Sequence, residues 1–239
     1  MTAHPNVLVV TPTYNERDNL PVLVRAVLCR EGYRMLVVDD GSPDGTGAIA
    51  DALAAEFPGR LEVMHRTGPR GLGRSYVDGL RHALASTDAD LICQMDADLS
   101  HSPDYLPDLV ETAARFDVVI GSRYLNGVSV VNWPLHRIFL SAFANKYIRA
   151  VTRLTPRDCT SGFRCWRRSA LSLLPLERMV SDGYAFLVEM LFEASRRGCR
   201  IGETPIIFVE RRLGHSKVSS AVLAESLIVP WRLVFSRSS

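Results

Sequence analysis

The chain has 239 residues, of which 47% are hydrophobic and 23% are charged, a composition typical of a soluble α/β enzyme with a full hydrophobic core. No apolar stretch approaches the roughly 18 residues of a transmembrane helix and no signal peptide is evident, so we expect a protein that does not cross the bilayer. The five cysteines form no CxxC pair and are expected to be reduced, as in a cytosolic protein.

The formal net charge of +2 conceals an uneven distribution along the chain. Residues 1–120 contain 10 Lys and Arg against 18 Asp and Glu, whereas residues 121–239 contain 18 against 8. The acidic half could hold a cation, and the basic half, which is almost entirely arginine, could attract an anionic partner or surface. An arginine-rich composition can equally reflect genome bias, so charge alone does not identify the partner.

The first 120 residues alternate short apolar runs with amphipathic stretches. Strands are predicted at 6–10, 35–38, 61–64, 91–95 and 117–120, and helices over 17–30, 46–57, from about 73 to 86, and over 103–116. Near-continuous aliphatic strands separated by helices predict a parallel sheet that is covered on both faces.

The second half is less regular. It predicts a basic amphipathic helix over 134–152, a short strand at 163–166, a helix over 185–197, a strand over 201–209 and a last amphipathic stretch over 221–235, interrupted by Pro230. No internal repeat, low-complexity segment or linker interrupts the sequence, which indicates one continuous domain.

The segment Met95-Asp96-Ala97-Asp98 ends an apolar run in two carboxylates. In an extended chain residues i and i+2 point the same way, so Asp96 and Asp98 would crowd two negative charges at the carboxyl end of a strand. A hard divalent cation with oxygen ligands would relieve this repulsion. The alternative is two solvated loop acids ahead of a helix that begins near Pro103.

Polar residues also follow two other strands, at 11–16 and 39–44. Open α/β sheets bind ligands outside the carboxyl ends of their strands, so these segments are the expected site. No GxGxxG follows the first strand and no GxxxxGK[ST] occurs, which argues against a dinucleotide cofactor and a P-loop ATPase. An acid-rich crevice of this kind would bind a nucleotide through carboxylates and backbone, with a metal ion neutralising the diphosphate.

Seven short motifs stand in order along the chain: Pro12-Thr13-Tyr14-Asn15-Glu16, Val38-Asp39-Asp40-Gly41-Ser42-Pro43-Asp44-Gly45-Thr46, Asp96-Ala97-Asp98, Gly121-Ser122-Arg123-Tyr124, Asn132-Trp133-Pro134, Ser161-Gly162-Phe163-Arg164 and Gly214-His215-Ser216-Lys217. Together they closely resemble family 2 glycosyltransferases of the polyprenyl-phosphate (dolichol-phosphate) mannose synthase type, over about residues 7–217. The first three motifs are shared by many family 2 enzymes, and the later ones point to the polyprenyl-phosphate subgroup.

The resemblance implies a single GT-A-type α/β domain over 1–239, with a central mostly parallel sheet flanked by helices and with C-terminal amphipathic helices. Residues 1–120 would bind nucleotide and metal, 121–218 would bind the acceptor, and 219–239 would form an amphipathic helix. The implied reaction is inverting transfer of mannose from GDP-mannose to a polyprenyl (dolichyl) phosphate, which gives a β-linked product.

Several alternatives stay open. UDP-glucose or another nucleotide sugar could be the donor. A saccharide hydroxyl could be the acceptor, which would need a carboxylate base, and Asp158 and Asp182 are the candidates. A metal-dependent nucleotidyltransferase would usually have a glycine- and arginine-rich loop where this chain has Thr11-Pro12-Thr13-Tyr14. A noncatalytic nucleotide-sugar sensor is the remaining class.

Carried over residue by residue, the resemblance assigns roles to particular side chains. The nucleotide sugar would contact Pro12, Tyr14, Glu16, Val38, Asp39, Asp40, Asp96, Ala97, Asp98, Arg211 and Lys217. Mg²⁺ or Mn²⁺ would be held by Asp96 and Asp98, with Ser100 where some relatives have glutamine. The acceptor phosphate would meet Arg123, Arg137 and Ser141, and the expected catalytic residues are Asp98, Arg123 and Arg137.

A lipid acceptor requires contact with a membrane. Segments 134–152 and 221–235 have the mixed basic and apolar faces of interfacial helices, although packing of either helix on the sheet is as good an explanation. We expect a cytoplasmic protein that lies peripherally on the cytoplasmic face of the membrane. An integral membrane protein is a candidate partner, and no nucleic acid is expected.

Overall fold

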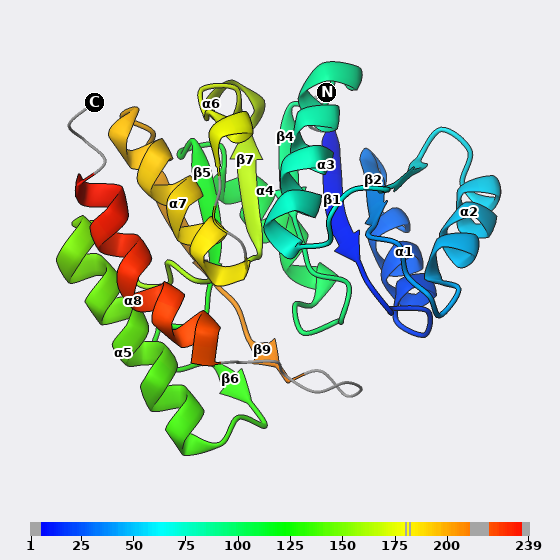
Figure 1. Cartoon of the computed structure of the whole chain (residues 1–239). Helices are drawn as coiled ribbons and strands as arrows, with labels where there is room; N and C mark the ends of the chain where they lie inside the picture. The colour runs from blue at the N-terminus through cyan, green and yellow to red at the C-terminus, as the bar shows by residue number, and fades with distance from the viewer. Residues whose placement is uncertain (1–5, 180, 182, 211–219, 236–239) are drawn as a thin grey trace.

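The computed structural model describes residues 6–179, 181, 183–210 and 220–235, and a seven-stranded sheet runs through its centre (Figure 1). The strand order is β3-β2-β1-β4-β7-β5-β8. The strands are β1 (Val7–Thr13), β2 (Tyr33–Asp39), β3 (Leu61–His65), β4 (Leu91–Gln94), β5 (Val118–Ser122), β7 (Arg164–Arg167) and β8 (Ile201–Pro205). Strand β7 pairs antiparallel with β4 and β5, and the other pairings in the described sheet are parallel, so the predicted mostly parallel sheet is confirmed.

Alternating residues of β1 point to opposite faces of the sheet, and both faces are buried. Val7 and Val9 belong to a core formed with α1 (Leu20–Leu28), α2 (Thr46–Glu56) and α4 (Leu106–Thr112). Leu8 and Val10 belong to a second core formed with α3 (Leu72–Ser86) and α7 (Gly183–Arg196). This double burial explains why the strands are almost continuously aliphatic.

Two boundaries in the first half differ from the prediction. Strand β1 continues past Val10 to Thr13, because Thr11, Pro12 and Thr13 pair in register with Val37, Val38 and Asp39 of β2. The single helix expected over 103–116 is a 3₁₀ turn, η1 (Pro103–Tyr105), followed by α4, which ends at Thr112. The polar end of β1 is therefore held rigidly within the sheet.

The second half contains elements that the sequence pattern did not indicate. The strand expected over 201–209 is divided into β8 and β9 (Phe208–Val209), and β9 pairs with β6 (Val130–Val131) in a small separate sheet. The other unpredicted elements are α6 (Arg168–Leu171) and the 3₁₀ turn η2 (Leu176–Arg178).

Helices α5 (Leu135–Thr152) and α8 (Ser220–Phe235) lie side by side at one end of the sheet (Figure 1). The hydroxyl of Tyr147 on α5 donates a hydrogen bond to the carbonyl of Leu227 on α8 at 2.8 Å. Among the residues that the structure describes, no helix is long and apolar enough to span a membrane.

Candidate active site

The predicted site residues of the first half gather at the carboxyl ends of β1, β2 and β4. Strand β1 lies between β2 and β4, so the connections on its two sides run in opposite directions. Such a change of direction opens a crevice at the carboxyl edge of an α/β sheet. The residues that follow these strands therefore face a common crevice.

The pair Asp96 and Asp98 is held at the end of β4 by specific contacts. The hydroxyl of Tyr76 on α3 donates to Asp96 Oδ1 at 2.9 Å, and the backbone N–H of Ser100 donates to Asp98 Oδ1 at 3.0 Å. Leu99, between Asp98 and Ser100, adopts φ of +60°, a left-handed conformation that a leucine rarely takes. Strained backbone of this kind is concentrated at functional sites, and here it forms the turn that presents both carboxylates.

The side chains around this turn fit a divalent metal ion. The hydroxyl of Ser100 is buried and has no hydrogen-bond partner in the described part of the chain, and the same is true of His101 Nδ1. Two carboxylates and a hydroxyl form the oxygen-rich set that Mg²⁺ and Mn²⁺ prefer. Among the residues that the structure describes, no group of three or more His, Cys, Asp and Glu side chains is arranged to hold a metal ion.

His101 shows that Asp96 and Asp98 are close to Arg123, one of the predicted acceptor residues. Burial is the main cause that lowers the pKa of His101; Asp96 and Asp98 oppose this effect and Arg123 adds to it. The His101 ring also contacts Phe163 and Phe208, with centroid distances of 5.3 and 5.1 Å. One buried imidazole thus lies within electrostatic reach of both parts of the site.

The acids at the end of β2 already have partners within the protein. Asp40 forms an ion pair with Arg66 and accepts the N–H of Gly71 at 2.8 Å. Asp39 accepts hydrogen bonds from the Ser42 hydroxyl at 2.6 Å and from Thr13 Oγ1 at 3.2 Å. Both carboxylates therefore shape the loops of the crevice.

Tyr14 and Glu16 differ in how they could meet a nucleotide. The ring of Tyr14 is exposed, and the Arg70 guanidinium lies 5.0 Å from its centroid. Glu16 is half-buried and accepts a hydrogen bond from Asn19 at 2.8 Å. Arg66 and Arg70 were missed by sequence reasoning, which treated 66–73 as a connection. Nothing in the sequence relates this connection to the end of β2, so no sequence signal could have found them.

Three predicted contacts are buried side chains. Val38 is fully buried and faces α3, where a Cβ placed on Gly79 would lie 2.8 Å from its Cγ2. Pro12 and Ala97 are buried as well. Val38 is therefore part of the packed interface between the sheet and α3.

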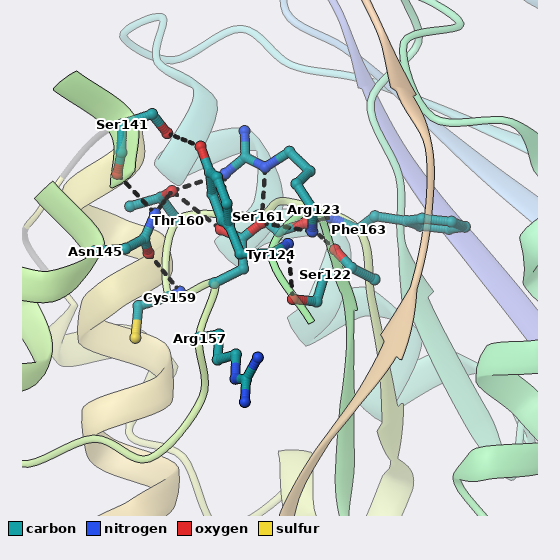
Figure 2. A network of polar contacts seen from close by, with 12 residues as sticks. Ser122, Arg123, Tyr124, Ser141, Asn145, Arg157, Cys159, Thr160, Ser161 and Phe163 are labelled. Carbon is teal, nitrogen blue, oxygen red and sulfur yellow. Dashed lines mark hydrogen bonds and ion pairs between the residues drawn. The ribbon is translucent and has the colours of Figure 1, made fainter. Parts of the chain in front are cut away.

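Arg123, at the end of β5, is buried in a polar network (Figure 2). Its Nε and Nη2 donate to the two oxygens of Asp158, both at 2.7 Å, and Nη2 also donates to Thr160 Oγ1 at 2.8 Å. Burial alone would raise the pKa of Asp158, but the charge and hydrogen bonds of Arg123 outweigh it, so the pKa lies below its usual value. Asp158 is thus an ionised partner of Arg123, which makes it a poor general base.

The other predicted acceptor residues lie beside Arg123. Tyr124 donates its hydroxyl to Ser141 Oγ at 2.8 Å, as Figure 2 shows. Arg137 donates to Glu210 Oε2 at 2.6 Å. Asn145, which sequence reasoning missed, accepts the N–H of Cys159 at 2.7 Å and so ties α5 to this network. The Arg123 guanidinium lies 5.6 Å from the ring centroid of Tyr124, and Arg123 and Arg137 both lie over the ring of Trp133, so the structure brings Arg123, Arg137 and Ser141 together.

Three predicted residues, Arg211, Lys217 and Asp182, lie outside the described residues.

Comparisons with known proteins agree with this geometry. Residues 8–174 match the family model for Glycosyl transferase family 2. The chain is 44% identical over 223 residues to the polyprenol monophosphomannose synthase of Mycolicibacterium smegmatis. This match covers 92% of this chain and 83% of that protein. It is also 44% identical over 223 residues to the undecaprenyl-phosphate mannosyltransferase of Micrococcus luteus, with 93% and 91% covered.

Among solved structures, glucosyl-3-phosphoglycerate synthase from Mycobacterium tuberculosis, in complex with Mn²⁺, UDP and glucosyl-3-phosphoglycerate, has a TM-score of 0.71 at 19% identity. The match covers 98% of this chain and 80% of that chain. This likeness confirms the GT-A-type fold.

Proposed function

The chain belongs to glycosyl transferase family 2, and on that premise we propose that it transfers mannose to a polyprenyl phosphate. The observation that carries the proposal is 44% identity, over more than nine-tenths of the chain, to two enzymes named for that transfer. The site supports it, because an acidic pair suited to a metal ion lies near arginines suited to a phosphate.

We further propose GDP-mannose as the donor, bound in the crevice at the carboxyl ends of β1, β2 and β4. Residues 1–120 would bind nucleotide and metal, and 121–218 would bind the acceptor. Tyr14 offers an exposed ring on which a base can stack. Asp96, Asp98 and Ser100 would hold Mg²⁺ or Mn²⁺, and the bound ion would supply Lewis-acid stabilisation to the leaving diphosphate.

The acceptor chemistry agrees with the lack of an available base at Asp158. A phosphate monoester has a second pKa of about 6, so at neutral pH it is already largely a dianionic nucleophile. Arg123 and Arg137 would orient it and reduce its repulsion from the donor phosphates. A bond forms from an acceptor phosphate oxygen to the anomeric carbon, and the bond to the diphosphate breaks with its electron pair. In-line attack inverts the anomeric centre and gives a β-linked mannosyl phosphate.

A substrate panel tests the proposal. The full chain is incubated with short-chain polyprenyl phosphate, Mg²⁺ or Mn²⁺ and one radiolabelled nucleotide sugar at a time. We expect label from GDP-mannose in a lipid fraction that mild acid cleaves. Label from UDP-glucose instead would show that the proposed donor is wrong. Label in a saccharide would show that the proposed acceptor is wrong.

We also propose that helices α5 and α8 dock on the cytoplasmic face of a membrane that carries the acceptor lipid. Their exposed large apolar side chains are Leu135, Phe139, Leu140 and Phe143 on α5 and Leu227, Ile228, Trp231 and Phe235 on α8. Because the two helices lie side by side, we infer that these side chains form one apolar surface next to basic residues of α5. Apolar side chains beside positive charge are what an anionic lipid surface attracts.

Flotation with vesicles of phosphatidylcholine and phosphatidylglycerol tests this docking. We expect the protein to float with the vesicles at low salt, and the doubly substituted variant Phe139→Ser, Phe143→Ser to float much less. Val22→Ser, which removes an exposed apolar side chain from α1, is the matched control and should float normally. A wild-type protein that stays with the soluble fraction at low salt would contradict the proposal.

A further inference from the structure

The ring of Trp133 lies next to both arginines assigned to the acceptor phosphate. Its centroid is 4.1 Å from Arg137 Cζ and 5.6 Å from Arg123 Cζ. Phe208 packs edge-on against the same ring, with a centroid distance of 5.4 Å and an interplanar angle of 70°. The indole therefore forms a wall shared by both guanidinium groups, each placed for a cation–π contact.

The indole Nε1 of Trp133 is a buried donor that has no hydrogen-bond partner among the described residues. An indole nitrogen can only donate, and native proteins rarely leave such a buried group unsatisfied. Trp166 provides the comparison within this chain, because its Nε1 donates to Gln94 Oε1 in the core at 2.8 Å. The donor of Trp133 is therefore suited to a ligand atom.

The backbone on both sides of Trp133 is conformationally restricted. Asn132 adopts φ of +65°, in the left-handed region that asparagine tolerates better than most residues. Pro134 follows and caps the start of α5, and a residue before proline is restricted to extended conformations. These restrictions, together with the packing of Phe208 against the ring, limit where the indole can lie.

We propose that Trp133 is a further acceptor-binding residue, whose indole N–H donates a hydrogen bond to the phosphate monoester held by Arg123 and Arg137. The inference rests on the proposed function, which supplies the chemistry of the acceptor. A hydrogen bond to an ionised oxygen is roughly twice as strong as a neutral one. The indole also adds direction without adding charge, which distinguishes it from the two arginines.

Indole N–H signals in a ¹⁵N–¹H spectrum test the contact directly, because the chain has three tryptophans. Single Trp→Phe variants assign the signals. Farnesyl phosphate should move the Trp133 signal downfield and leave that of Trp166 in place, whereas farnesol, which lacks the phosphate, should not move Trp133 downfield. An unmoved Trp133 signal at saturating farnesyl phosphate, or an equal shift with farnesol, would overturn the inference.

Trp133→Phe tests the consequence for catalysis, because it keeps an aromatic face for both arginines and removes the N–H. We expect the KM for farnesyl phosphate to rise about tenfold, with the KM for the nucleotide sugar and the unfolding temperature unchanged. Tyr33→Phe removes a donor from a buried ring at the amino end of β2 and should leave both KM values unchanged.

Arg137→Ala distinguishes a wrong role for Trp133 from a wrong acceptor site. If Arg137→Ala raises the acceptor KM and Trp133→Phe does not, the acceptor site stands and the role of Trp133 is wrong. If neither substitution changes the acceptor KM, the acceptor site itself is wrong and the inference fails with it.

Discussion

At the scale of single residues, the site depends on partners that lie far apart in the sequence. The pairs Asp40–Arg66 and Arg123–Asp158 are separated by 26 and 35 residues. Sequence reasoning identified Asp40 and Arg123 from their motifs, but it could not identify their partners, because a pattern contains no information about which distant loop returns to a strand end. Asp158 was considered only as a base, whereas in the structure it is the counter-ion of a buried arginine.

Asp158→Asn should show what this buried pair contributes to stability. Removing one charge leaves Arg123 buried without its counter-ion, so we expect the free energy of unfolding at pH 7 to fall by about 3–5 kcal/mol. Urea unfolding measures the loss. Glu177→Gln, which removes an exposed partner of Arg81, should change stability by less than about 1 kcal/mol.

The pH dependence of this difference has a defined sign. The pKa of Asp158 is lowered in the folded protein, so its contribution is complete above the unfolded pKa of about 3.9 and is lost as the pH falls through the lower folded value. The stability difference between wild type and Asp158→Asn should therefore be equal at pH 7 and pH 5, and should shrink only below about pH 4. A difference that already shrinks between pH 7 and pH 5 would contradict this account.

At the scale of elements, the sequence predicted the first half better than the second. The hydrophobic period and the length of an apolar run identify aliphatic strands such as β2 and β4, which are buried on both faces. They do not identify β6 and β9, because two-residue strands are defined by their pairing partner. Whether 201–209 continues as one strand is also a tertiary question: β8 stays beside β5, whereas β9 leaves to pair with β6.

The close approach of α3 to the sheet gives a prediction at this scale. A Cβ on Gly79 would lie 2.8 Å from both Val10 and Val38, closer than real contacts allow. Gly79→Ala should therefore destabilise the protein by about 1–3 kcal/mol, although alanine is the better helix former. Gly68→Ala, where the added methyl group would meet only Arg66 at 3.9 Å, is the matched control and should be nearly neutral in thermal unfolding. Equal stability of the two variants would contradict the packing argument.

At the scale of the whole molecule, the charge asymmetry has a spatial meaning. Most of the acidic first 120 residues form the part of the sheet with α1, α2 and α3, while β5 lies beside β8, and the basic second half contributes α5, α7 and α8 at the other end (Figure 1). The candidate site lies where the two parts meet, with Asp96 and Asp98 on one side and Arg123 and Arg137 on the other. A cation bound to the donor diphosphate would thus meet the negative charge of the two carboxylates. The acceptor phosphate would meet the positive charge of the two arginines.

Nucleotide binding should therefore stabilise the whole molecule only when a divalent ion is present. With GDP and Mn²⁺ at about 100 times the dissociation constant, linkage adds about 2.7 kcal/mol, which for a chain of this size raises the unfolding temperature by roughly 5–10 °C. GDP with a chelator should give little shift, and Mn²⁺ alone should give less than the pair. Asp98→Ala should abolish the joint shift, because it removes half of the carboxylate pair. An equal shift with GDP in chelator, or a full shift in Asp98→Ala, would mean that the nucleotide is held without the proposed metal.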